Sequence, residues 1–187
     1  MLNYNSSIRE KKSYSGLIVE EIYPIMKLNL RGKSRDFLTT IGKNINMILP
    51  MEANTSSSSD NFTSMWLSPD EWMVISNSRV DKEDNNYPIE KILFDKISQT
   101  KLGAVTDVSD QFVMLALKGE KIFDLLSMGC PFNFNDFRSK KGAVIQTLLL
   151  QIDVIFHHKE TNSVNLFVRK SFSEHLMSWI NDAASRL

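Results

Sequence analysis

The chain has 187 residues, of which 42% are hydrophobic and 24% are charged, a composition typical of a folded globular protein. Its 22 Lys and Arg residues balance 22 Asp and Glu residues, so it lacks the basic excess that nucleic-acid-binding proteins carry. The length favours one domain, or one domain of two intimate lobes.

Export and membrane insertion are not indicated by the sequence. Residues 1–24 are polar and contain no apolar run as long as a secretory signal needs. The most apolar later segment, residues 143–156, includes polar side chains and is too short to cross a bilayer. Because Cys130 is the single cysteine, the chain can form neither an internal disulfide nor a Cys-based zinc site. We therefore expect a cytoplasmic protein that makes no contact with membranes.

A five-residue phrase occurs twice in the chain. Residues 28–32 read Leu-Asn-Leu-Arg-Gly, and residues 115–119, which lie 87 positions later, read Leu-Ala-Leu-Lys-Gly. Each copy is followed at the same spacing by a second glycine, Gly42 or Gly129. Because this offset is close to half the chain length, the sequence predicts two related halves.

The first copy predicts a strand, a turn and a helix. Apolar and polar residues alternate over 26–31, which is typical of a strand with one buried face. Gly32 is expected to end this strand. Apolar spacing then predicts a helix over 33–41, closed by Gly42 in the left-handed conformation.

The second copy predicts the same elements. Residues 113–117 form the expected strand, and apolar residues on both of its faces indicate a position deep in its sheet. Gly119 is expected in the turn. A helix over 122–128 is expected to stop at Gly129.

Further strands and a second helix follow each copy. Residues 52–60 are a polar loop, and residues 68–70 are the turn of a hairpin. Ser171 and Glu174 have the spacing of a capping box that opens the last helix. We expect strands over residues 62–67, 71–76, 144–151, 154–158 and 164–169, a helix from Pro88, and a buried stripe of Phe172, Leu176, Trp179 and Ala183 on the last helix.

The order strand, helix, strands, helix therefore occurs twice, which indicates an α+β fold. We expect residues 1–23 to be a polar N-terminal extension. Residues 24–187 then form a single domain of two pseudo-symmetric halves, at about 24–100 and 104–187.

Histidine and cysteine residues do not have the spacing of a metal site. His157 and His158 are adjacent, so on a strand they point to opposite faces and cannot ligate one metal together. We expect them at an edge or on the surface. His175 has no partner at ligand spacing, and Cys130 is expected to be a small buried residue at a helix exit.

The densest polar cluster beside an apolar strand is the segment 107–110. Asp107 and Ser109 could position a substrate, but the same residues commonly satisfy free backbone donors at a turn. We favour the structural interpretation, and the substrate-positioning alternative stays open. The inventory contains no convincing catalytic set, which favours an accessory or binding role.

Several short motifs, taken together, resemble a known family. They are Leu67-x-Pro-Asp-Glu-Trp72, Val105-Thr-Asp-Val-Ser-Asp110, Leu117-x-Gly119, Gly129-Cys-Pro131, Gln146-Thr147 and Phe167-Val-Arg169-x-Ser171-Phe172-x-Glu174. In order and spacing these motifs resemble the gamma subunit of heterotetrameric sarcosine oxidase, over roughly residues 24–184. The residues of the structural signature come from these motifs and from the repeated phrase: Gly32, Gly42, Asp107, Ser109, Gly119, Gly129, Ser171 and Glu174.

The resemblance implies a fold similar to the folate-binding domain of glycine-cleavage aminomethyltransferases, in which two halves exchange strands. It implies a cytoplasmic accessory subunit that supports the oxidative demethylation of sarcosine to glycine. The FAD, FMN, NAD and tetrahydrofolate sites are then expected in the alpha and beta subunits and zinc in the delta subunit. No catalytic, cofactor or metal residue is expected in this chain.

Two departures from the family pattern bear on function. Residues 150–153 lack the glycine-rich hairpin of folate-binding relatives, which indicates an eroded folate site, and Gln111 stands where the family often has Arg. A free-standing folate-binding or folate-dependent one-carbon transfer protein remains the alternative. The sequence does not name the interface residues or the N-methyl amino acid that the complex oxidises.

Overall fold

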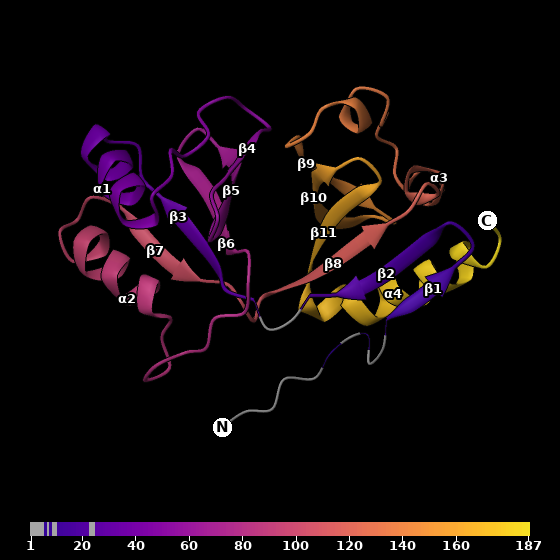
Figure 1. The fold of residues 1–187 in the computed structure, drawn as a ribbon, viewed down its shortest axis with the longest axis horizontal. Helices are drawn as coiled ribbons and strands as arrows, with labels where there is room; N and C mark the ends of the chain where they lie inside the picture. Colours follow the sequence, from indigo (N-terminus) through magenta and orange to yellow (C-terminus); the bar gives the residue numbers. More distant parts are fainter. Residues whose placement is uncertain (1–5, 7, 9–10, 23–24) are drawn as a thin grey trace. The chain divides into compact units, whose positions relative to one another are not determined.

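The chain folds into two compact units that alternate along the sequence (Figure 1). In the computed structural model, residues 6, 8, 11–22 and 25–187 are described. One unit, here called the inserted unit, is the continuous segment 24–110. The other, the split unit, combines residues 1–23 with 111–187.

The split unit contains an antiparallel sheet with the strand order β1-β2-β8-β11-β10-β9. Side chains of its helices α3 and α4 share one hydrophobic core with the sheet. The elements are β1 (Lys12–Tyr14), β2 (Leu17–Glu21), β8 (Phe112–Lys118), α3 (Ile122–Ser127), a 3-10 helix (Phe137–Ser139), β9 (Val144–Leu149), β10 (Ile152–Glu160), β11 (Ser163–Arg169) and α4 (Lys170–Ala184).

The inserted unit contains an antiparallel sheet with the order β4-β5-β6-β3-β7. Helices α1 and α2 lie together on one side of this sheet (Figure 1) and share its core, where Phe37 packs near Trp72. The elements are β3 (Lys27–Arg31), α1 (Arg35–Ile45), β4 (Ser56–Ser58), β5 (Phe62–Ser68), β6 (Glu71–Ser76), α2 (Pro88–Leu93), a π-helical turn (Phe94–Ser98) and β7 (Ala104–Asp107).

The two sheets repeat one strand order. The split unit runs β2-β8-β11-β10-β9 after its edge strand β1, and the inserted unit runs β7-β3-β6-β5-β4. In this correspondence β8 matches β3. β2 precedes β3 in sequence but pairs with β8. In the same way, β7 precedes β8 in sequence but pairs with β3. The strand that precedes β3 in sequence thus lies in the sheet of β8, and the strand that precedes β8 lies in the sheet of β3.

The two compact units differ in extent from the halves that the sequence predicts. Residues 12–21, assigned to a separate extension, form β1 and β2 of the split unit, because the alternating Leu17 and Val19 are buried in its core. Residues 1–5, 7, 9, 10 and 23 of that extension lie outside the described residues. The inserted unit ends at residue 110, after β7, and not near residue 100.

The predicted strands are confirmed, including the hairpin of β5 and β6. The strand predicted at 144–151 is shorter than expected, because Leu150 and Gln151 form the turn between β9 and β10. The strand predicted at 113–117 is β8, and all five of those residues are buried. Because β8 lies between β2 and β11, it is an internal strand, as the apolar residues on both of its faces indicated.

The predicted end of α1 is wrong. Gly42 lies inside the helix, which continues to Ile45 and closes at Asn46 in the left-handed conformation, with φ of 50°. Asparagine tolerates this conformation better than most residues, so the glycine is not needed there. The Met47 amide donates to the Gly42 carbonyl instead.

The predicted capping box of α4 is also wrong. The helix begins at Lys170 directly after β11, and Arg169 occupies the N-cap without a side-chain cap. Ser171 and Glu174 therefore lie within the first turns and are exposed. Phe172 of the predicted stripe is 45% exposed, whereas Leu176 and Ala183 are buried as expected.

Candidate functional site

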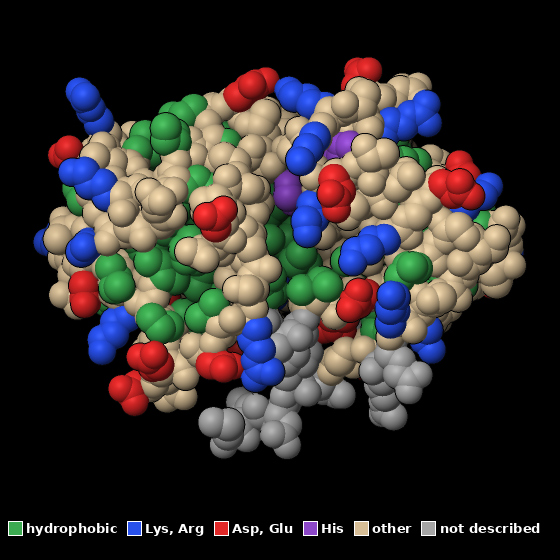
Figure 2. Space-filling view, in the orientation of Figure 1, with side chains coloured by type: hydrophobic (Ala, Val, Ile, Leu, Met, Phe, Trp, Pro, Cys, Tyr) green, Lys and Arg blue, Asp and Glu red, His purple; other side chains and the backbone are tan. Residues whose placement is uncertain are grey.

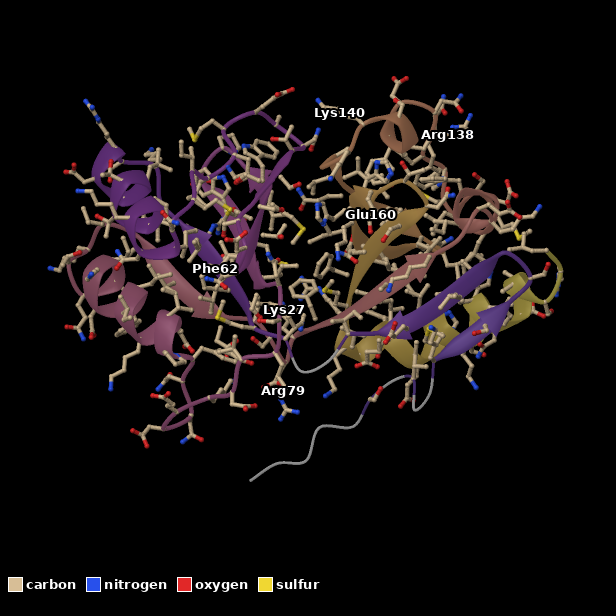
Figure 3. The ribbon with its side chains drawn as sticks, viewed as in Figure 1. Lys27, Phe62, Arg79, Arg138, Lys140 and Glu160 are labelled. Atoms are coloured by element: carbon tan, nitrogen blue, oxygen red, sulfur yellow. The ribbon has the colours of Figure 1, made fainter. Side chains whose placement is uncertain are left out.

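The segment 107–110 lies at the end of the inserted unit, where Asp107 and Ser109 form a polar cluster with Lys27 that we call the polar joint. Asp107 Oδ1 accepts a hydrogen bond of 2.8 Å from the Ser109 amide, which is an Asx turn. The Ser109 hydroxyl accepts from the Lys27 amide at 2.8 Å and donates to the Lys27 carbonyl at 3.3 Å. The end of β7 is thereby held against the start of β3, where Figure 3 labels Lys27.

Lys27 is buried with only 2% of its surface exposed. Its ammonium donates to the Ser109 carbonyl at 3.0 Å and to the Ile25 carbonyl at 3.4 Å. A buried ammonium is costly unless hydrogen bonds replace its hydration. These carbonyl contacts make Lys27 a second polar tie between the two ends of the inserted unit.

An ion pair extends this cluster toward the surface. Lys82 Nζ lies 2.6 Å from Asp107 Oδ2 and 4.9 Å from the centre of the Tyr87 ring. Burial opposes ionisation of Asp107, but hydrogen bonds from Lys82 and Ser109 outweigh it and lower the pKa of the carboxyl. Burial likewise opposes charge on Lys82, and Asp107 outweighs it and raises the pKa of the ammonium. Burial raises the pKa of the Tyr87 hydroxyl.

The contacts of this cluster support the structural interpretation. Both Asp107 oxygens are engaged, and the Ser109 hydroxyl uses its donor and an acceptor on one backbone residue. A pocket of about 350 Å³ lies beside Asp107, between α2 and β7, with Phe94 in its lining. The pocket leaves room for a small molecule, so substrate positioning stays an alternative.

The histidine pair does not lie at the surface, so that prediction is wrong. His157 and His158 are 4% and 3% exposed, because β10 is flanked by β11 and β9. His158 Nδ1 lies 2.9 Å from the Lys140 carbonyl, on the loop before β9 where Figure 3 labels Lys140. His157 lies on the opposite face of the strand, 3.4 Å from the Asn165 amide nitrogen. Burial lowers the pKa of His157 to about 4.

The described residues contain no group of three or more His, Cys, Asp and Glu side chains that could hold a metal ion. Cys130 is buried as expected, and its sulfur lies 4.0 Å from the Thr147 hydroxyl. His175 is exposed on α4.

Within the part of the chain that the structure describes, no helix is long and apolar enough to span a bilayer.

The signature glycines lie at close contacts. Gly119 has φ of +129°, and a side chain there would collide with the Gly16 carbonyl. A Cβ at Gly32 would lie 2.6 Å from the Phe37 ring, and one at Gly129 would lie 2.9 Å from the Trp179 ring. Gly129 follows α3 without a left-handed φ, so its role is packing and not the predicted helix stop.

An apolar groove lies beside α1 and the segment that follows this helix. The groove has a volume of about 690 Å³, and its lining includes Leu38, Lys43, Met47, Ile48, Leu49 and Met51. Ile48 and Met51 are the most exposed large hydrophobic residues of the described chain, at 85% and 61%. Over the face shown in Figure 2, charges of both signs are interspersed among green hydrophobic patches.

Comparison with known proteins identifies the family. A family model described as sarcosine oxidase, gamma subunit family, matches residues 31–186. The chain belongs to this family. The sequence resemblance to it is thereby confirmed over most of the two units.

Two proteins from Corynebacterium sp. U-96 are similar to this chain. The chain is 27% identical over 121 residues to a protein named sarcosine oxidase subunit gamma, a match that covers 65% of this chain and 55% of that protein. It therefore spans about half the length of this curated relative. A chain of the heterotetrameric sarcosine oxidase, solved in complex with pyrrole 2-carboxylate, superposes with a TM-score of 0.79. That match covers 94% of this chain and 87% of the other at 22% identity, and it confirms a mixed α+β fold.

The three tryptophans of the chain pack against the cores of the two units. Trp72 is fully buried, while Trp66 and Trp179 are partly buried against the two cores. The exposed Ile48 was missed. The available signal was the apolar run at 47–51, which continues beyond the end of the amphipathic helix pattern.

Proposed function

We propose that the chain is a non-catalytic accessory (gamma) subunit of a heterotetrameric sarcosine oxidase. In this role it supports the oxidative demethylation of sarcosine to glycine by the alpha and beta subunits. The observation that carries the proposal is the family match over residues 31–186. The polar joint agrees with an accessory role, since its charged groups are engaged in holding the backbone.

The proposed fold is a duplicated domain of the kind seen in the folate-binding domain of glycine-cleavage aminomethyltransferases. Two observations support duplication: the repeated phrase at 28–32 and 115–119, and the shared strand order of the two sheets. In this proposal the exchange of β2 and β7 places the first strand of each half in the sheet of the other half, so the split unit is discontinuous in sequence. The two pseudo-symmetric halves proposed within residues 24–187 then need β2, at Leu17–Glu21, to complete the sheet of the split unit.

The proposed partners are the alpha, beta and delta subunits of the oxidase. FAD, FMN, NAD, tetrahydrofolate and zinc are then bound by those subunits and not by this chain. We assign the assembly to the cytoplasm, because a chain with a single cysteine fits a reducing compartment.

Co-expression with the neighbouring oxidase genes tests the proposal. We expect this chain, carrying an affinity tag, to retain the other subunits in stoichiometric amounts. We also expect the oxidase prepared without it to lose stability or sarcosine-dependent peroxide formation. An equally stable and active oxidase without the chain, together with failure to co-purify, would contradict the accessory role.

One observation favours the folate-binding alternative. A pocket of about 400 Å³ in the split unit is lined by Asp153, Arg169 and Thr147, beside the hairpin of β9 and β10. A folate site there predicts thermal stabilisation of the isolated chain by tetrahydrofolate, by about 2.7 kcal/mol at one hundred times the dissociation constant. Because the hairpin lacks glycine, we expect no shift at saturating tetrahydrofolate.

A further inference from the structure

The groove beside α1 combines exposed apolar side chains with a fixed backbone. Ile48 has 85% of its surface exposed, although Met47 and Leu49 on either side are buried. Its own carbonyl accepts a hydrogen bond of 2.6 Å from the Ser57 hydroxyl. Two residues later, the Pro50 carbonyl accepts a bond of 2.8 Å from the buried Trp72 indole. Ile48 is therefore held outward by contacts on both sides.

The start of this segment is fixed as well. Asn46 closes α1 in the left-handed conformation, and its amide donates to the Gly42 carbonyl. A surface whose backbone is already ordered loses little conformational entropy when a partner binds. Exposed aliphatic side chains grouped around a groove are typical of interaction sites. The segment 46–51 therefore has the properties of a preorganised docking surface.

Among the described residues that line the groove, Lys43 carries the one charged side chain. Arg35 and Lys43 lie eight residues apart on α1, with Thr39 between them, so all three share one face of the helix. Among the described residues, neither cation forms an ion pair within 4.0 Å. Carboxylates of a partner would complement these cations.

We propose that this groove is the docking site for another subunit of the oxidase, which inserts aliphatic side chains between Leu38, Ile48 and Met51. The same partner segment carries Asp or Glu residues that meet Lys43 and Arg35. The inference rests on the accessory role proposed above and deepens it, since it assigns the contact to the inserted unit. A helix laid along α1 fits this mode of recognition.

Co-purification of substituted chains with the co-expressed oxidase tests the docking site. Ile48→Glu places a charge where the partner's aliphatic side chains would bind, and we expect retention of the other subunits to fall about tenfold. Met128→Glu is the matched control, because Met128 is 52% exposed and lies in the split unit, outside the groove. It should retain the partners as the unsubstituted chain does. Unchanged thermal melting of both variants verifies that they are folded.

A charge reversal tests the second part of the inference. Lys43→Glu should weaken retention several-fold at low salt and much less at about 1 M salt, where charges are screened within about 3 Å. Lys141→Glu, an exposed position in the split unit, is the control.

The outcomes separate this inference from the accessory role. If the unsubstituted chain retains no partner, the accessory role itself fails. If it retains the partners and Ile48→Glu does so equally, the docking site is wrong while the accessory role stands. The remaining alternative is that a second copy of this chain occupies the groove, and sedimentation velocity of the isolated chain tests it. A dimer that Ile48→Glu dissociates would assign the groove to a second copy and overturn the proposal.

Discussion

His157 and His158 are neighbours on β10 in different surroundings. His158 Nδ1 bonds to the Lys140 carbonyl, and its Nε2 is buried without a partner among the described residues. Its ring lies 5.5 Å from that of Phe137, within an aromatic cluster. His157 faces the other side of the sheet, beside Asn165. Both rings are therefore held as packing groups, although histidine is commonly a surface residue.

The buried His157 makes stability depend on pH. The pKa of His157 falls from its usual 6.5 to about 4 in the folded chain, mainly through burial. Between these two pH values the unfolded chain binds more protons than the folded chain, so the free energy of unfolding rises with pH. The stabilisation that depends on neutral His157 is therefore lost as the pH falls from 6.5 to 4. Relative to acidic pH, this effect stabilises the folded chain above pH 6.5 by roughly 3 kcal/mol.

Urea denaturation of the chain and of His157→Gln between pH 4 and 7.5 measures this contribution. The substituted chain should have a flatter profile over the window. His175→Gln, at an exposed position, should keep the slope of the unsubstituted protein. Parallel profiles for His157→Gln and the unsubstituted chain would refute the assignment.

Ser109 provides the second prediction at this scale. Ser109→Ala leaves the buried Lys27 amide without its acceptor, a loss that costs about 1–3 kcal/mol. We expect the urea midpoint to fall, and amide hydrogen exchange at Lys27 and Val108 to accelerate. Ser127→Ala, at the exposed end of α3, removes a hydroxyl outside the joint and should cause no loss of stability.

At the scale of elements, the hairpin of β9 and β10 shows how packing overrides turn preference. Leu149 pairs with Ile152, so Leu150 and Gln151 form a two-residue turn. Both have positive φ, of 54° and 66°, which costs a residue other than glycine roughly 1 kcal/mol or more. Leu150 packs against the core of the split unit, while Gln151 is exposed. The unfavourable conformation of Leu150 is thus offset by its burial, and that of Gln151 is not.

Glycine substitutions in this turn should therefore act in opposite directions. Gln151→Gly removes the strain at an exposed site and should stabilise the chain by about 0.5–1 kcal/mol. Leu150→Gly also removes strain but loses core contacts, and we expect net destabilisation. Thermal melting of the two variants is the measurement. Equal effects of both substitutions would show that the turn conformation alone decides the energy.

At the scale of the whole molecule, the two units differ in how they depend on chain continuity. All residues of the inserted unit's core lie within 24–110, and its sheet uses strands of that segment alone. The core of the split unit requires Leu17 and Val19 from the beginning of the chain. Without β2, the internal strand β8 would become an exposed edge.

Fragments test this difference. Residues 24–110 should fold alone, with a cooperative denaturation transition and dispersed amide resonances. Residues 111–187 should aggregate or remain molten, because the β8 edge and its apolar residues are uncovered. Fusing residues 11–22 to the second fragment through a flexible linker should restore cooperative unfolding. A well-folded 111–187 fragment would show that β2 is dispensable.

Local patterns predicted much of the fold. Alternation over 26–31 predicted β3, and the apolar faces of residues 113–117 predicted an internal strand. Gly119 was expected in a turn and has a positive φ there. These features depend on near neighbours in the sequence, which is why composition and spacing suffice.

Helix ends and burial were less predictable. Gly42 and Ser171 have the right residue types for a stop and a cap, but α1 closes at Asn46 and α4 starts directly from β11. Which of several suitable residues ends or begins a helix depends on the position of the adjoining segment in the folded chain. The burial of His157 likewise depends on the strands on either side of β10, which adjacent residues do not specify.

The sequence by itself determined the repeated strand-turn-helix phrase, the strands, and membership of the gamma subunit family, because each is a property of residue order. Only the tertiary structure decided that β2 and β7 cross into opposite sheets and that Ile48 is held at the surface. Strand pairing is set by backbone hydrogen bonds between distant segments. The exposure of Ile48 is set by Ser57 and Trp72, which meet segment 46–51 only after folding.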